Sequence, residues 1–145
     1  MNIGDIVCME LILFKNGVDH DSKSGRPCVY IGEKNDVMYF IPLQSVKNKS
    51  KGYYIKPDNY NKLKKTSILN LHTILEKRAQ FFKVDGIVRE EEMETIMKIL
   101  VSYFKDARRE QSSVVKSLAI EYLDRNKKDI KFVDKDIKKK QDKRK

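Results

Sequence analysis

The hydrophobic pattern of this 145-residue chain changes its period after Asp85-Gly86, and this change restricts the fold more than any other feature. Before that point, short runs rich in β-branched and aromatic residues are separated by polar, turn-forming segments, a pattern typical of β-strands. We expect strands over residues 5–14, 27–32, 37–43, 53–56 and 67–75. The cluster GEKND between the second and third runs predicts a hairpin, so the first three strands form a meander.

After Gly86 the apolar residues recur at helical spacing. One stripe, at i, i+3, i+4, i+7, i+8 and i+11, consists of Met93, Ile96, Met97, Leu100, Val101 and Phe104. A second helical pattern consists of Val114, Val115, Leu118, Ala119 and Tyr122. Strands followed by helices predict an α+β fold, a small and strongly bent sheet or barrel with helices packed at one edge.

The positive charge is concentrated near the C-terminus. The chain carries a formal charge of +10, and residues 126–145 hold nine Lys and one Arg against four Asp. Two interpretations of this tail stay open, a solvated terminus and a sequence-independent contact with RNA phosphates. We expect a main domain over residues 1–108, an additional helix over 109–128 and a basic, disordered tail over 129–145.

The chain lacks the sequence signals of several large classes of protein. It has no apolar run of 18 residues and no basic-then-apolar start, so we expect a cytoplasmic protein that does not contact a membrane. It also has no Gly-rich phosphate loop, no GxSxG and no HExxH. The two cysteines have no zinc-site spacing, and we expect neither a metal nor a cofactor.

The polar groups that remain suit the cleavage of RNA. The 2′-hydroxyl of RNA is its own nucleophile, so an enzyme needs only a base, a cation for the developing phosphorane charge and help for the leaving oxygen. His20 precedes Arg26 by six residues in one loop, and Arg26 stands directly before Pro27 at the start of a predicted strand. Ser45 and Lys47 follow the last apolar residue of the third strand. Binding residues commonly occupy such strand ends.

Five segments between Gly4 and Phe104 resemble the MazF/PemK/Kid family of toxins. They are, in order, GDIV, SGRPCVYI, IPLQS, LNLHTILEKR and KVDGIVREEEMETIMKIL. The second is similar to the family's GxRPVLVI, and the third to its P-[IVL]-T-S. The resemblance implies an SH3-like barrel that forms homodimers and cleaves single-stranded RNA sequence-selectively without metal. It also implies a cognate antitoxin, for which a protein is favoured over an RNA.

The resemblance assigns roles by position. Arg26 matches the family's arginine before proline, which stabilises the reacting phosphate, and His20 matches a loop histidine of the Kid-like branch. Gln44 stands where many members have threonine, and Ser45 matches the serine that follows. The related ToxN-like toxins end the third strand in PLTSPK, which this chain shares at Ser45 and Lys47.

These matches lead to a specific set of predicted site residues. The predicted catalytic residues are Arg26, His20 and Ser45. The predicted substrate contacts are Lys47, Gln44, Lys23, Lys49 and Tyr53. Residues 49–60 interleave cations with aromatics, as the binding of single-stranded RNA requires, although packing explains these tyrosines equally well. The reaction would leave a 2′,3′-cyclic phosphate.

The family pattern fails at some positions, and two alternatives therefore stay open. Ser67 and Leu69 fall near positions where some members carry an acidic residue and an arginine. Together with Gln44, they favour a non-catalytic barrel that binds RNA or a protein. A gyrase-poisoning toxin of the same fold is the other alternative. His72 falls inside the fifth predicted strand, which favours a structural role.

Overall fold

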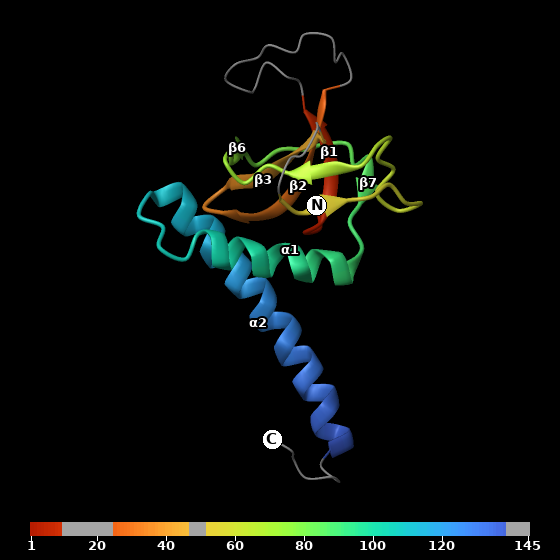
Figure 1. Cartoon of the computed structure of the whole chain (residues 1–145). Coiled ribbons are helices and arrows are strands. Elements are labelled where there is room, and N and C mark those ends of the chain that lie inside the picture. Colours follow the sequence, from red (N-terminus) through yellow and green to blue (C-terminus); the bar gives the residue numbers. More distant parts are fainter. Residues whose placement is uncertain (10–24, 47–51, 139–145) are drawn as a thin grey trace.

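The computed structural model describes residues 1–9, 25–46 and 52–138, with side chains described up to residue 126 (Figure 1). The strands are β1 (Asp5–Met9), β2 (Arg26–Lys34), β3 (Val37–Ser45), β4 (Tyr54–Ile55), β5 (Ser67–Leu69), β6 (Leu75–Arg78) and β7 (Gly86–Ile87). The helices are α1 (Glu90–Tyr103) and α2 (Glu110–Lys138). Strands followed by helices confirm the expected α+β class.

The sheet is antiparallel and curls around its central strand, β3. Its strand order is β4-β5-β3-β2-β1-β7, and β6 also pairs with β3. One edge of β3 pairs with β2, whereas the other pairs first with β6 and then, over its last three residues, with β5. Because β3 changes partners along one edge, the sheet bends into a half-barrel, with both helices on one side of it (Figure 1).

The expected hairpin is confirmed between β2 and β3. Its two turn residues, Asn35 and Asp36, have φ angles of 51° and 67°. A two-residue hairpin with positive φ at both positions matches the twist of the strands that it joins, and Asn and Asp tolerate this conformation best after glycine. The local sequence therefore specifies this turn.

The expected strand over residues 67–75 is wrong as a single element. The chain forms β5 and β6 instead, separated by a turn at Leu71 and His72. Asn70 Oδ1 accepts a hydrogen bond from the backbone N–H of His72 at 3.0 Å. Such an Asx turn competes with strand pairing, which explains the break. It also lets two short strands pair with successive parts of β3.

Apolar side chains cover both faces of the sheet. The helix-side face, which packs against α1 and α2, includes Ile6, Val29, Ile41 and Leu43. The opposite face carries a second cluster of buried residues, which are Val7, Met9, Cys28, Tyr30, Met38, Phe40 and Leu75. Strands that are buried on both faces read as continuous apolar runs, so their sequence does not reveal which residues share a face.

Beyond the sheet, α2 is longer than the helix expected from the sequence. It begins at Glu110 and its backbone continues through residue 128 to Lys138. Among its side chains that the structure describes, up to residue 126, the buried ones are Val115, Leu118, Ala119 and Tyr122. There α2 packs against α1 and β2, and Figure 1 shows its later turns extending away from the sheet.

Candidate functional site

Arg26 and Gln44 lie at the same end of two paired strands. Cys28 of β2 is paired with Pro42 of β3, and Arg26 and Gln44 each stand two residues farther toward the same end. Because strand residues alternate between faces, Arg26 and Gln44 share the face of Cys28 and Pro42. This is the face that carries the second apolar cluster, away from the helices. The structure thus brings these two predicted site residues together.

Arg26 is held by β1 as well as by its own strand. It is paired with Met9 of β1, and its carbonyl oxygen accepts a hydrogen bond from Cys28 Sγ at 3.4 Å. The side chain is half-buried, and its Nε atom is buried. A cation that is partly removed from water attracts a phosphate more strongly than a fully solvated one. Arg26 therefore places a partly buried positive charge at this end of the sheet.

Gln44 is oriented by the neighbouring strand. Its Oε1 accepts a hydrogen bond from Asn70 Nδ2 at 3.1 Å, and Asn70 lies just past the end of β5. Since Oε1 is directed to Asn70, the amide nitrogen is the part of Gln44 suited to donate to a phosphate oxygen or a base. Sequence reasoning missed Asn70. Its only signal was the turn propensity of Asn within the run LNLH.

Ser45 is on the other side of the sheet by strand alternation. It follows Gln44, so it shares a face with Leu43, which lies in the helix-side core. Its partner across the strand pair is Ser67 of β5. Ser45 is the last residue of β3 and is exposed. The structure does not bring it to the face that Arg26 and Gln44 share.

Tyr53 also belongs to the helix side. Its hydroxyl donates a hydrogen bond to Glu92 Oε2 of α1 at 3.0 Å, and its ring packs against the helix-side core. Burial, together with the hydrogen bond and charge of Glu92, raises the pKa of Tyr53 to about 12. The structure gives this tyrosine a packing role and does not place it beside Arg26.

Tyr53→Phe is expected to lower the free energy of unfolding by about 1 kcal/mol at pH 8, because the hydroxyl loses Glu92 as its acceptor. The pKa of Tyr53 rises from 10.0 to about 12 on folding, so its contribution is complete below pH 10 and is lost as pH rises toward 12. Urea unfolding of both proteins at pH 8 and 11.5 checks this. Tyr60→Phe serves as an exposed control, and a difference that grows with pH would contradict the prediction.

The other predicted site residues are His20, Lys23, Lys47 and Lys49. All of them lie outside the described residues, so their roles stay predictions.

His72 lies in an exposed turn, not in a strand as the sequence indicated. Its Nδ1 is 3.2 Å from the hydroxyl of Tyr103, and the two rings meet edge to face with their centroids 6.2 Å apart. Tyr103 is the last residue of α1. This pair therefore links the turn between β5 and β6 to the end of the helix.

The two thiols near Arg26 are poor nucleophiles. Burial, followed by the charge and hydrogen bond of Asp85, raises the pKa of Cys8 to about 11. Burial raises the pKa of Cys28 still further. Because the thiolate is the reactive form, neither residue suits nucleophilic catalysis at neutral pH.

Asp85→Asn is expected to accelerate the alkylation of Cys8 by iodoacetamide at pH 8 several-fold, because one cause of its raised pKa is removed. Mass spectrometry of the labelled thiol over time gives the rate. Cys28 is fully buried and serves as an internal control that should stay unlabelled in both proteins. An unchanged rate for Cys8 would show that Asp85 does not control its reactivity.

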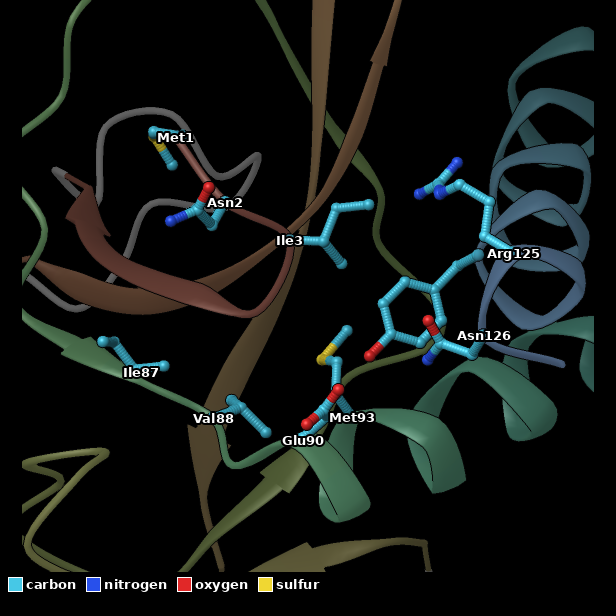
Figure 2. Close-up of a pocket in the computed structure, with 10 residues that line it drawn as sticks. Met1, Asn2, Ile3, Ile87, Val88, Glu90, Met93, Arg125 and Asn126 are labelled. Carbon is cyan, nitrogen blue, oxygen red and sulfur yellow. The ribbon is translucent and has the colours of Figure 1, made fainter. Parts of the chain in front are cut away.

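A separate groove lies between the start of the chain, α1 and α2 (Figure 2). It has a volume of about 540 Å³, an apolar floor that includes Ile3 and Met93, and charged residues Glu90 and Arg125 from the two helices. Among the described residues that line it, none is a predicted site residue. The groove is therefore distinct from the Arg26 and Gln44 face.

Two further pockets, one lined by Tyr39 and Gln111 and one by Asp36 and Lys77, lie in the described part of the chain. Within it, no three His, Cys, Asp or Glu side chains come close enough together to hold a metal ion. No helix in that part is both long and apolar enough to cross a membrane.

Comparison with known proteins assigns no family to this chain. No protein-family model matches the chain, and no match is found among curated proteins. The functional assignment therefore depends on the residues and geometry of this chain.

Proposed function

We propose that this protein is the toxin of a bacterial toxin–antitoxin system, an endoribonuclease that cleaves single-stranded RNA without a metal ion. The observation that carries the proposal is the placement of Arg26 and Gln44 at one end of β2 and β3, on the same face. The curled antiparallel sheet with two helices is compatible with an SH3-like barrel of the MazF/PemK type. The short segments that resemble this family add support along the first 104 residues.

In the proposed reaction the ribose 2′-oxygen attacks the adjacent phosphorus, and the bond from phosphorus to the 5′-oxygen breaks. The 2′-hydroxyl gives up its proton to a base, and the leaving 5′-oxygen takes up a proton. The products are a 2′,3′-cyclic phosphate and a 5′-hydroxyl end. The guanidinium of Arg26 stabilises the charge on the phosphorane oxygens, and the amide of Gln44 donates to the substrate.

Proton transfer in this proposal belongs to His20 in preference to Ser45. Strand alternation puts Ser45 on the helix side, away from Arg26, whereas His20 precedes Arg26 by six residues in the sequence. An imidazole also titrates near neutral pH, where it can both accept and give a proton. In this proposal Lys23, Lys47 and Lys49 add phosphate contacts.

On the basis of the family resemblance, we also propose partners for this protein. These are a second copy in a homodimer and a protein antitoxin that covers the RNA site, both in the cytoplasm. Sedimentation of the purified chain tests the dimer, and inhibition of cleavage by the product of a neighbouring gene tests the antitoxin.

The decisive experiment is incubation of the purified protein with a mixed pool of single-stranded RNA in EDTA. We expect defined fragments that end in 2′,3′-cyclic phosphate. A non-catalytic RNA-binding barrel is the second candidate, because Gln44 replaces the family's threonine and Ser45 shares no face with Arg26. Retention of intact RNA would favour that candidate. If the protein neither cleaves nor retains the RNA, both candidates are contradicted. A protein target such as gyrase would then remain.

A further inference from the structure

A row of paired residues extends the Arg26 and Gln44 face across the sheet. Ile68 of β5 is paired with Gln44 of β3 on one side and with Tyr54 of β4 on the other. Residues directly opposite each other in antiparallel strands share a face. Tyr54, Ile68 and Gln44 therefore stand in one row, and Arg26 continues it on β2.

The middle residue of the row is buried, and the residue at its outer end is exposed. Ile68 is only 4% exposed, and its side chain lies against Gly52, where an added Cβ would come within 2.8 Å of Ile68 Cδ1. Tyr54 is 39% exposed and belongs to β4, the outermost strand of the sheet order. The row thus has Arg26 and Gln44 at one end and the partly exposed ring of Tyr54 at the other, with Ile68 buried against Gly52 between them.

Alternation gives the adjacent tyrosines different environments. Tyr53 faces the helices and donates its hydroxyl to Glu92, whereas Tyr54 is on the face of Gln44. The sequence prediction named Tyr53 as a substrate contact. The register favours Tyr54 for that role, because only Tyr54 shares a face with the proposed phosphate site.

The spacing of the row suits a short piece of single-stranded RNA. Neighbouring strands lie about 4.8 Å apart, so Tyr54 is about 10 Å from Gln44 and about 14 Å from Arg26 along the sheet. A dinucleotide can span this distance. Exposed aromatic rings beside cationic groups bind single-stranded RNA by stacking, because every base has a π-face.

We propose that Tyr54 is the base-stacking residue of the RNA site, on which a base next to the cleaved phosphodiester lies while Arg26 contacts the phosphate. This inference rests on the proposed function and adds to it a second substrate contact, at the β4 end of the row. The aromatic contact gives affinity for any single-stranded base, and the polar groups near Gln44 can then select among bases.

The absence of tryptophan from the whole sequence makes a direct test possible. Tyr54→Trp introduces one indole at the end of the row, and the probe is a single-stranded 2′-O-methyl RNA oligonucleotide, which cannot be cleaved. We expect the RNA to quench the indole fluorescence by stacking. Tyr54→Ala should weaken the binding of a fluorescently labelled copy of this oligonucleotide roughly ten-fold, and Tyr54→Phe should preserve it.

Tyr60→Trp is the matched control. Tyr60 is 58% exposed, against 39% for Tyr54, and it lies outside the row, beside Arg89, with 5.5 Å between the guanidinium carbon and the ring centroid. Its fluorescence should change much less when RNA binds. Circular dichroism of each variant confirms that the fold is kept, and Tyr54→Trp keeps the test valid even where Tyr54→Ala does not fold.

The outcomes separate this inference from the function on which it rests. If wild-type protein binds the RNA, yet the Tyr54→Trp emission stays constant and Tyr54→Ala binds as tightly as wild type, the stacking role is wrong and the ribonuclease proposal stands. If wild-type protein neither binds this RNA nor cleaves ordinary RNA, both are wrong. Equal quenching at positions 54 and 60 would also overturn the assignment, because it would show no preference for the row.

Discussion

Arg26→Ala is expected to reduce the rate of RNA cleavage at least about 100-fold, because it removes the cation that stabilises the phosphorane in the proposed reaction. The half-buried guanidinium at the start of β2 has a fixed strand position, so no other side chain of β2 can take its place. Single-turnover cleavage of a labelled RNA in EDTA, with the chain at saturating concentration, measures this rate without the contribution of binding.

The matched control for Arg26 is Arg78→Ala. Arg78 is an exposed arginine at the end of β6, paired with Val37 at the opposite end of β3 from Gln44. This variant should cleave at the wild-type rate, and Arg26→Lys should recover only part of the loss because it lacks the paired donors of a guanidinium. Equal losses at positions 26 and 78, or an unfolding midpoint that falls with Arg26→Ala alone, would remove the catalytic interpretation.

Phe40→Ala is expected to lower the free energy of unfolding by about 3–5 kcal/mol, because it leaves a cavity in the second apolar cluster. Phe40 is fully buried, and its ring centroid lies 5.4 Å from those of both Tyr30 and Phe82. Urea unfolding followed by circular dichroism measures the change. Phe81→Ala is the control, since Phe81 is 89% exposed and its loss should change stability by less than about 0.5 kcal/mol.

Comparable losses at positions 40 and 81 would contradict this prediction. They would show that the segment before β7, and not the sheet face, controls stability. The comparison also tests whether the face that carries Arg26 has a packed interior of its own, independent of the helices.

The sequence predicted the local features of this fold well and the breaks in regular structure poorly. The hairpin at Asn35 and Asp36 depends only on those two residues, and the stripe from Met93 to Phe104 depends only on helical spacing, so both were predictable. The division of residues 67–75 depends on one side chain, Asn70, and on the partners that β3 offers to each half. The predicted helix ends at residue 128, whereas α2 continues to Lys138. No Gly or Pro follows Tyr122, so the sequence carries no signal that stops the helix at a particular residue.

The candidate site was predictable in its residue types but not in its faces. Arg26 was identified from its position before Pro27 and Gln44 from the family resemblance, and the structure brings them together. Which of Gln44 and Ser45 shares a face with Arg26 depends on the register between β2 and β3. The run VMYFIPLQS is apolar on both faces and carries no alternation that could reveal it. The same ambiguity hides which of Tyr53 and Tyr54 shares a face with Gln44.

The long second helix sets where charge near the C-terminus can act. Its 29 residues measure about 43 Å, and it starts beneath the sheet, on the side away from Arg26, and runs outward from there (Figure 1). In the proposed function, lysines near the C-terminus would contact the RNA at a distance from the strand ends. Truncating α2 should therefore weaken the binding of RNA and reduce the salt dependence of that binding. The RNA bonds that are cleaved should stay the same.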